Sequence, residues 1–249
     1  MSLRQAKLTP RLAVICDMVV GVVCADIGTD HALLPCALVQ SGRVSHAYAT
    51  DINPGPLARA AATISACGLE GKVETLLCDG IPPAVAAACD TVIVAGLGGE
   101  TIADILARAP VRLKTQLLLQ PMTRAPQLRA FLCENGYRIT RERLAAEPGR
   151  VYVILEAFPE GAACKGAGCE GAACEGAACE GAAYSAAELE IGRFGPDEDP
   201  ALVRAHVRAR LASLSRKRGG LVRGGAPPQP LTALESLMRA CEEEYHDFI

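Results

Sequence analysis

The stretch VVCADIGTDH (residues 22–31) decides the fold of this chain. It is a continuous apolar run that ends in a polar turn with one glycine. Such a run is typical of a strand that is buried on both faces of a sheet. A helix is predicted directly after the turn, over about 31–40. A buried strand followed at once by a helix is the unit from which parallel sheets are built.

The alternation of strand and helix continues to residue 158. Strands are predicted at 22–30, 46–52, 72–80, 90–99, 114–121, 137–145 and 150–158. Helices are predicted at 10–20, 31–40, 54–67, 100–107 and 126–135. The last two strands form a hairpin around Glu147-Pro148-Gly149, a turn sequence. The pattern predicts an α/β fold of the Rossmann-like class, with a mostly parallel seven-stranded sheet and one antiparallel strand at its end.

Composition excludes several other classes of protein. No apolar run reaches the roughly 18 residues that a membrane span needs. The first residues, MSLRQAKLTPRL, lack the apolar core of a secretory signal, so we expect a cytoplasmic protein without a membrane partner. Eight of the 12 cysteines sit singly in apolar segments, where a reduced thiol acts as a small hydrophobic group.

A five-residue repeat, EGAAC with small variations, fills residues 160–184. It carries Cys164, Cys169, Cys174 and Cys179, but this spacing is unusual for zinc and no histidine accompanies it. We expect a low-complexity insertion in an exposed loop and no structural metal. The repeat divides the chain into a catalytic domain (1–159), the insertion (160–184) and a C-terminal domain (185–249).

The C-terminal segment predicts a hairpin of two amphipathic helices. Asp199-Pro200 is a helix start, and apolar side chains follow at helical spacing at Val203, Val207, Leu211 and Leu214. A linker is predicted at 219–230, and Thr232 with Glu235 matches a capping box that would start the second helix. Two such helices joined by a short linker are expected to pack in antiparallel fashion.

A basic run lies on the first of these helices. Residues 201–223 contain seven Lys or Arg and no Asp or Glu, although the net charge of the chain is −3. The run suits RNA phosphates better than a merely solvated helix face, because it has no acidic partner in its own segment. The predicted RNA-binding residues are Arg204, Arg208, Arg216, Lys217 and Arg218.

Acidic side chains end three successive predicted strands. Asp26 ends the first, Asp51 the second and Asp79 the third, while Gly28 allows a tight turn. In open α/β sheets ligands bind at these strand ends. A carboxylate after the second strand is the usual partner of a ribose diol, and one after the third can accept from an adenine amine.

A dinucleotide-binding site is a poorer interpretation of the same stretch. It requires G-x-G-x-x-G after the first strand, where this chain has G-T-D-H-A-L. Asp26 and Asp30 would repel a diphosphate. They suit the ammonium and sulfonium groups of S-adenosylmethionine, which is therefore the predicted cofactor.

The motifs together resemble those of a known family. DIGTDHALLP, the acidic end of the second strand, CDG, VIVAGLGGETIADIL and LLLQP look like the TrmK family, bacterial tRNA adenine-N1 methyltransferases that act at adenosine 22. The resemblance covers about residues 8–158 and resumes at 187–196 before a helical C-terminal domain. The cysteine repeat is a departure from the family and leaves the domain junction open.

The resemblance implies roles for individual residues. Asp30 and His31 would face the transferred methyl group as catalytic residues. Asp30 would stabilise the cationic product or hydrogen-bond N6, and His31 would relay a proton, although His31 equally suits a helix cap. The residues expected to bind the cofactor are Asp26, Ile27, Gly28, Thr29, Asp51, Ile52, Asp79, Gly80 and Gly96.

The turn after the fourth strand bears on the methyl acceptor. Enzymes that methylate an exocyclic amine usually carry a [DNS]-P-P-[YF] turn there, whereas this chain has AGLGG. A ring nitrogen is therefore the favoured acceptor, and reaching adenine N1 requires base flipping. The composition names no aromatic clamp for the base. The alternatives are a methyltransferase of this fold that acts on another RNA, a protein or a small molecule, and a catalytically silent RNA-binding protein.

Overall fold

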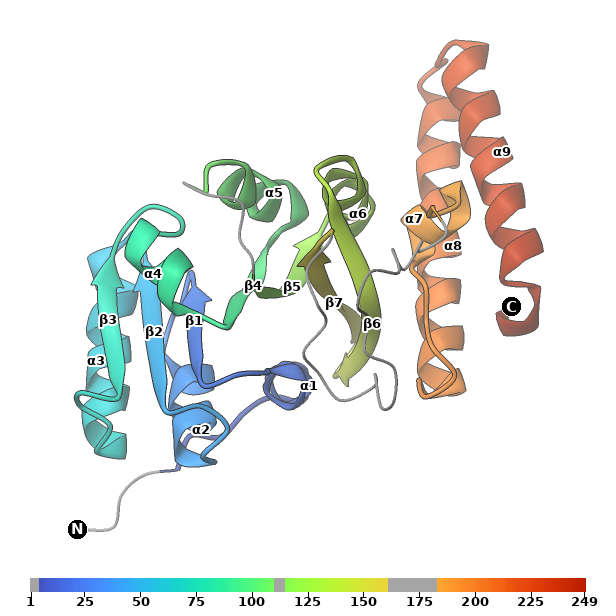
Figure 1. Ribbon diagram of the computed structural model, residues 1–249. Coiled ribbons are helices and arrows are strands. Elements are labelled where there is room, and N and C mark those ends of the chain that lie inside the picture. Colours follow the sequence, from blue (N-terminus) through green and yellow to red (C-terminus); the bar gives the residue numbers. More distant parts are fainter. Residues whose placement is uncertain (1–4, 110–114, 161–182) are drawn as a thin grey trace.

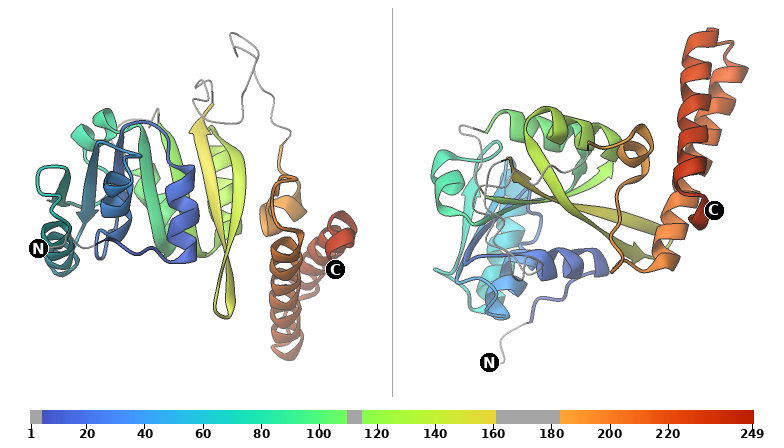
Figure 2. Two further views of the ribbon diagram at one scale, coloured as in Figure 1. Left: turned by 90° about the horizontal axis from the view of Figure 1, so that it is seen from below. Right: turned by 45° about the vertical axis from the view of Figure 1, so that its right-hand side comes forward.

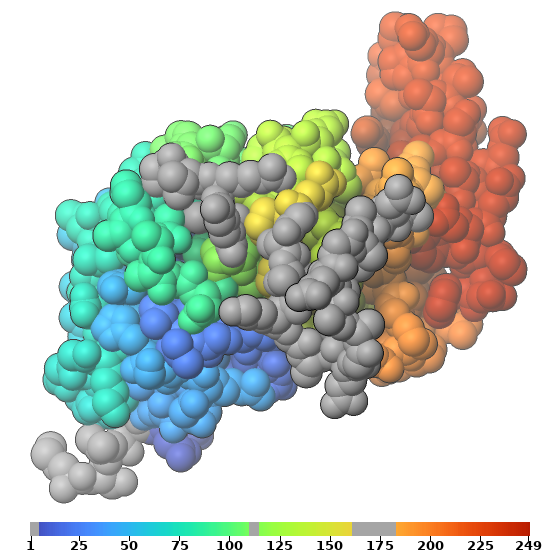
Figure 3. Space-filling view, in the orientation of Figure 1, coloured from blue at the N-terminus to red at the C-terminus, as the bar shows by residue number. Residues whose placement is uncertain are grey.

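The computed structural model describes residues 5–109, 115–160 and 183–249. An α/β body is followed by a helical C-terminal segment (Figure 1). The space-filling view shows the C-terminal helices standing out from the body as an arm (Figure 3). The four cysteines of the repeat lie outside the described residues, and the division of the chain into three parts stays a prediction.

The body is built on one seven-stranded sheet with the order β3-β2-β1-β4-β5-β7-β6. All neighbours are parallel except those of β7, which is antiparallel to β5 and β6. The strands are β1 Val23–Ile27, β2 His46–Asp51, β3 Val73–Leu77, β4 Thr91–Gly98, β5 Gln116–Thr123, β6 Tyr137–Glu147 and β7 Arg150–Pro159. The predicted Rossmann-like fold is confirmed. The order reverses between β1 and β4, which is where sheets of this kind bind their ligands.

Helices cover both faces of the sheet. Helices α1 (Pro10–Met18), α2 (Leu33–Gln40) and α3 (Pro54–Cys67) pack on one face together with Ile93. Helices α4 (Pro83–Ala88), α5 (Gly99–Ala107) and α6 (Ala125–Glu134) pack on the other, together with Val92 and Val94. Adjacent residues of β4 thus enter different cores, because successive side chains of a strand point to opposite faces.

Local sequence signals explain where most helices start and stop. Proline occupies the first turn of α1 after Thr9 and of α3 after Asn53, as predicted. Gly68 ends α3 with φ +66°, a left-handed conformation that glycine adopts without strain. The short helix α4 was not predicted, since its run of alanines carries no periodic apolar pattern.

The C-terminal segment contains α7 (Ala186–Ile191), α8 (Pro200–Arg223), α9 (Pro228–Glu244) and a short 3₁₀ helix (His246–Phe248). Both views of Figure 2 show α8 and α9 side by side, so the predicted hairpin is confirmed. Asp199 caps α8 by accepting a hydrogen bond from Ala201 N at 2.8 Å.

The predicted position of the linker was wrong. Helix α8 continues through Gly219 and Gly220 to Arg223, and only 224–227 separate it from α9. The capping box at Thr232 does not form, because Thr232 Oγ1 donates to Pro228 O inside α9 at 3.1 Å. Prolines are accepted in the first turn of a helix, where their missing N–H has no intrahelical partner. Helix α9 therefore begins earlier than the capping pattern suggested.

The eight cysteines in the described ranges are free, and six of them are buried. Burial raises the pKa of Cys36 and Cys89 to about 12, so these thiols stay protonated. Within the described residues, His, Cys, Asp and Glu form no group of three that could hold a metal ion. None of the helices described there has the length and apolar character to cross a membrane.

Candidate functional site

The carboxyl ends of four parallel strands meet at one edge of the sheet. In the sheet register Ile27 of β1 lies beside Thr50 of β2 and Val94 of β4, and Asp51 lies beside Leu77 of β3. The strands β1, β2 and β3 lie side by side in Figure 1. The turns that carry the predicted cofactor residues therefore share this edge.

The turn after β1 is fixed by backbone hydrogen bonds. Gly28 N and Thr29 N both donate to Thr50 O at 2.8 Å, and Thr29 Oγ1 accepts from Ala32 N at 3.2 Å. Gly28 has φ +80°, and a Cβ there would lie 3.4 Å from the Leu97 side chain. A glycine therefore allows both the conformation of the turn and its close approach to the end of β4.

Asp26 is a buried carboxyl group without a cationic partner. Its exposed fraction is 8%, and burial raises its pKa to about 6, against a smaller lowering by a hydrogen bond from Thr29. Within the described residues no Lys or Arg pairs with it. A buried carboxylate without a counterion favours a ligand that brings a positive charge.

The ends of β2 and β3 place carboxylates beside exposed apolar side chains. Asp51 Oδ1 accepts from Asn53 N at 2.7 Å, while Ile52 and Leu77 are 59% and 62% exposed. Asp79 forms an ion pair at 2.7 Å with Arg108, which directly follows α5, and that partner lowers the pKa of the Asp79 carboxyl. Gly80 follows with φ +78° and open space around its Cα.

Asp30 is held between two basic side chains. Arg59 Nε of α3 donates to Asp30 Oδ1 at 3.0 Å, and His31 Nε2 lies 3.3 Å from Asp30 Oδ2. Ala32, in a left-handed conformation with φ +49°, occupies the N-cap of α2, so His31 does not cap that helix. No local sequence pattern pointed to Arg59, which lies 29 residues from Asp30 along the chain.

The carboxyl end of β4 is joined to α1. The segment AGLGG, predicted to be a turn, instead continues β4 to Gly98 with an irregular register, and α5 begins directly at Gly99. Gly96, with φ +84°, donates its N–H to Gln120 Oε1 of β5 at 3.1 Å. Arg11 Nη1 donates to the same oxygen, and Gln120 itself is fully buried. Gln120 therefore does not end its strand, which continues to Thr123, and its side chain ties Gly96 of β4 to the first helix. Arg11 was missed by sequence reasoning, since its partner is 109 residues away.

These residues fit S-adenosylmethionine. The ligand carries an ammonium group for the unpaired Asp26, a ribose diol for Asp51 and an adenine amine for Asp79. Ile52 offers an exposed apolar face for the adenine ring. The set of donors and acceptors at the edge thus agrees with the chemistry of that cofactor.

The predicted RNA-binding residues of α8 divide into two groups. Arg204, Arg216 and Lys217 have no hydrogen-bonded or ionic partner among the described residues. Arg208 Nη2 donates to Ile249 O at 2.9 Å, and Arg218 Nε pairs with Glu235 Oε1 of α9 at 2.7 Å. The basic run therefore pairs in part with Glu235 of the facing helix, although residues 201–223 themselves contain no acidic residue.

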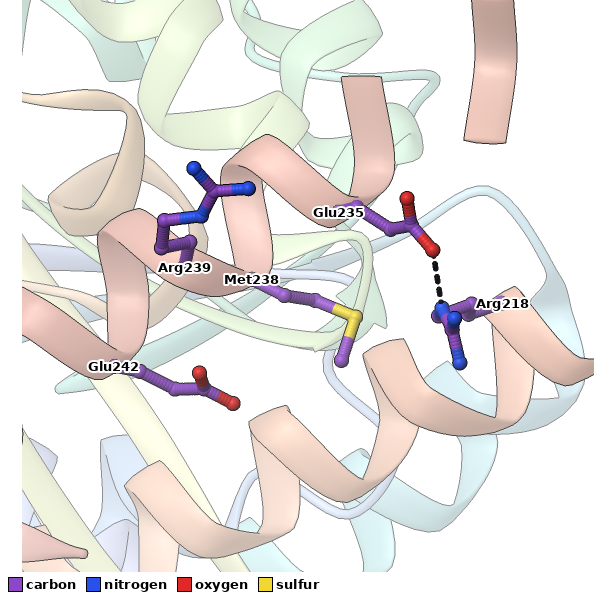
Figure 4. A pocket seen from close by; sticks show the side chains of 5 residues that line it. All are labelled: Arg218, Glu235, Met238, Arg239 and Glu242. Atoms are coloured by element: carbon purple, nitrogen blue, oxygen red, sulfur yellow. Dashed lines mark hydrogen bonds and ion pairs between the residues drawn. The ribbon is translucent and has the colours of Figure 1, made fainter. Parts of the chain in front are cut away.

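A shallow groove of about 250 Å³ lies between α8 and α9. Figure 4 shows its lining, which comprises Arg218, Glu235, Met238, Arg239 and Glu242. Its charges are mixed, and it belongs to the hairpin rather than to the strand ends. The groove is therefore separate from the candidate cofactor site.

The comparisons with protein families and with known sequences also indicate a methyltransferase. Residues 8–155 match the family model described as "Methyltransferase domain". A Bacillus subtilis protein named tRNA (adenine(22)-N(1))-methyltransferase is 34% identical over 158 residues. That match covers 62% of this chain and 66% of the relative, just under two thirds of its length.

Solved structures extend the likeness to nearly the whole chain. The Bacillus subtilis m1A22 tRNA methyltransferase TrmK has a TM-score of 0.75 and 26% identity, with 96% of this chain and 98% of that chain covered. A Streptococcus pneumoniae protein in complex with S-adenosyl-L-methionine has a TM-score of 0.69 and 25% identity, with 95% and 99% covered. The resemblance to TrmK that the motifs indicated is confirmed. The chain belongs to the methyltransferase domain family.

Proposed function

We propose that this chain transfers a methyl group from S-adenosylmethionine to N1 of an adenosine in tRNA, at position 22. The match to the Bacillus subtilis enzyme carries the proposal. The carboxylates at the strand ends and the AGLGG segment, which lacks the motif of exocyclic-amine methyltransferases, support it. Since tRNA is a cytoplasmic substrate, we place the activity in the cytoplasm.

The cofactor is held by residues of the first three strand ends. Asp26 pairs with its ammonium group, Asp51 accepts from the ribose hydroxyls and Asp79 from the adenine amine. When bound, S-adenosylmethionine supplies an electrophilic methyl group on a sulfonium. The remaining contacts come from the adjacent turns, through Ile27, Gly28, Thr29, Ile52, Gly80 and Gly96.

Asp30 and His31 act on the acceptor base. Adenine N1 has a free lone pair at neutral pH, so the protein chiefly has to align the nitrogen with the methyl carbon. As the N1–C bond forms and the C–S bond breaks, the ring becomes cationic. Asp30 stabilises that charge or accepts from N6, and His31 beside it takes a proton from N6.

The basic residues of α8 contact the body of the tRNA. Arg204, Arg216 and Lys217 are available for phosphates, while Arg208 and Arg218 would exchange their present partners for them. Each phosphate contact should appear in the salt dependence of tRNA binding. A small-molecule or protein methyltransferase of the same fold would have no use for this surface.

The test is methyl transfer from labelled S-adenosylmethionine to unmodified bacterial tRNA, with the product nucleoside identified by mass spectrometry. We expect 1-methyladenosine, and we expect it to disappear when adenosine 22 is replaced by guanosine. Cofactor binding without transfer to tRNA would favour another substrate. Absence of cofactor binding in calorimetry would favour a silent RNA-binding protein. Undiminished turnover by Asp30→Asn would remove Asp30 from the chemistry.

A further inference from the structure

One aromatic residue, Tyr152 of β7, lies near the carboxyl end of β5, at the same edge of the sheet as the candidate cofactor site. Strand β7 runs antiparallel to β5, with Leu155 opposite Leu119, so its first residues lie at the carboxyl end of β5. Arg150 Nη2 donates to Met122 O across this edge. Tyr152 is therefore placed beside the end of β5, whose other neighbour in the sheet is β4.

The other aromatic side chains lie elsewhere. The chain has five tyrosines, four phenylalanines and no tryptophan, all within the described ranges. Tyr48 packs against His46 in the first half of β2, away from the carboxyl end of that strand. The rest sit in α6, at the far ends of β6 and β7, or in the C-terminal segment: Phe131, Tyr137, Phe158, Tyr184, Phe194, Tyr245 and Phe248.

Two guanidinium groups lie over the Tyr152 ring. Arg11 Cζ is 5.3 Å from the ring centroid and Arg150 Cζ is 4.9 Å from it. Arg11 is tied to the core through Gln120 and through its own backbone N–H, which donates to Glu147 Oε1 at 3.3 Å. Arg150 is exposed, and its described hydrogen bond is to a backbone carbonyl. Arg11 is thus a fixed support for the ring, whereas Arg150 can leave it.

We propose that Tyr152 is the ring on which the target base stacks, and that Arg150 occupies that position in the free protein. The inference rests on the proposed function. A ring that already attracts two cations suits a base that becomes cationic on methylation, because a cation over an aromatic face is attracted by its quadrupole. The contact strengthens as charge develops, so it assists the reaction as well as binding.

Arg11 and Gln120 connect the Tyr152 ring to Gly96 of β4. Gln120 Oε1 accepts from both Gly96 N and Arg11, and Arg11 in turn contacts Tyr152. A base lying against Tyr152 is thereby placed relative to Gly96 at the carboxyl end of β4. Arg11 and Gln120 are positioning residues in this arrangement.

The test uses Tyr152→Leu and Tyr152→Phe, with steady-state kinetics on unmodified tRNA. Leucine keeps apolar volume without a π face, and phenylalanine keeps the face. We expect the leucine variant to lose about 10- to 100-fold in kcat/KM for tRNA, partly in kcat, and the phenylalanine variant to lose less than about threefold. The affinity for S-adenosylmethionine, measured by calorimetry, should stay within about twofold for both, because the ring lies on the acceptor side.

A second readout follows the base directly. With 2-aminopurine in place of the target adenosine, stacking on the wild-type and phenylalanine proteins should quench its emission, and the leucine protein should not. Wild-type kcat/KM in the leucine variant overturns the inference while leaving the proposed function intact. An equal loss in both variants also overturns it, because the hydroxyl rather than the ring face would then matter. If the wild-type protein methylates no tRNA, the proposed function fails and this inference fails with it.

Discussion

The residue with the clearest energetic signature is Asp26. Its pKa of about 6 in the folded protein exceeds the ordinary value of 3.8, because burial disfavours the charged form. A raised pKa means that the contribution of Asp26 to stability is greatest below pH 3.8 and is lost as the pH rises through about 6. A shift of about two units corresponds to roughly 3 kcal/mol of lost stability at neutral pH. In the free protein Asp26 is therefore a destabilising carboxylate at a position where a cationic ligand can pair with it.

Replacement of Asp26 by asparagine should therefore separate stability from function. We expect Asp26→Asn to raise the free energy of unfolding at pH 7.5 by up to about 3 kcal/mol, because no buried charge remains. The same change should weaken S-adenosylmethionine binding at least about tenfold, since the ammonium group loses its partner. Urea unfolding at pH 7.5 and pH 4, together with calorimetry, measures both effects. A less stable variant with unchanged cofactor affinity would contradict the prediction.

Among individual residues, the sequence predicts those that lie at the ends of recognisable strands and misses those whose partners are distant along the chain. The placement of Asp26, Asp51 and Asp79 along one edge of the sheet could be predicted because each lies at or just beyond the carboxyl end of a recognisable strand, and parallel strand ends share an edge. Arg59 and Arg11 could not be found, because their partners lie 29 and 109 residues away and no periodic pattern links them. Tyr152 is hidden for the same reason, since only the sheet order brings β7 beside β5.

Among the elements, α8 shows how packing overrides local propensity. Gly219 and Gly220 cost about 1 kcal/mol each inside a helix, and they suggested a linker. The helix continues past them because the partly buried Leu221 packs against the core and Arg218 pairs with Glu235 of the facing helix. Sequence reasoning predicts both helices from their apolar stripes, but the turn between them depends on contacts between the two helices.

The buried His206 of α8 should make the C-terminal segment sensitive to acid. Its Nε2 lies 2.8 Å from Ile191 O, its ring meets Phe194 edge-on, and burial lowers its pKa to about 4. A lowered histidine pKa leaves stability intact above about 6.5 and reduces it as the pH falls toward 4, because the unfolded chain takes up the proton first. The loss amounts to about 3 kcal/mol at most.

His206→Gln tests this sign, because glutamine can still donate to Ile191 O and does not titrate. At pH 7.5 we expect the variant to be less stable than the wild type by about 1 kcal/mol, through poorer packing. At pH 4.5 the difference should vanish or reverse, since the wild type alone has lost stability through this site. Asp26 is present in both proteins. A comparison of their urea unfolding at the two pH values therefore separates the effect of His206 on stability from that of Asp26. A difference that is the same at both values would refute the assignment.

At the scale of the whole molecule, a buried ion pair joins the sheet to the C-terminal segment. Arg129 of α6 and Glu142 of β6 are 1% and 0% exposed, with Arg129 Nη2 2.7 Å from Glu142 Oε2. Arg129 also donates to Leu189 O and Ile191 O at the end of α7, at 2.9 and 3.1 Å. Glu142 accepts from the residues on either side of α7, Tyr184 and Arg193. Gly192 lies against this ion pair, where a Cβ would be 2.6 Å from the Arg129 side chain. We call the Arg129–Glu142 pair and its contacts with residues 184–193 the joint.

This joint should set how the α8–α9 hairpin stands relative to the methyl-transfer site. Arg129→Met leaves Glu142 buried without its counterion and should cost about 3–5 kcal/mol of unfolding free energy. The double variant Arg129→Met with Glu142→Met should recover much of that loss. Arg43→Ala breaks an exposed pair with Asp17 and should cost less than about 1 kcal/mol. Urea unfolding measures all three.

The double variant also tests what the joint does for the substrate. It removes the hydrogen bonds to the end of α7 without leaving a buried charge, so the hairpin loses its fixed attachment while the sheet keeps its core. If tRNA is bound by the hairpin and the strand ends together, the KM for tRNA should rise at least about tenfold, because two surfaces that are no longer held in one geometry lose effective concentration. The affinity for S-adenosylmethionine should not change, since its predicted ligands lie at the carboxyl ends of β1, β2, β3 and β4, away from this ion pair. Equal losses for both ligands would mean that the pair only stabilises the fold, whereas an unchanged KM for tRNA would mean that the hairpin finds its place without the joint.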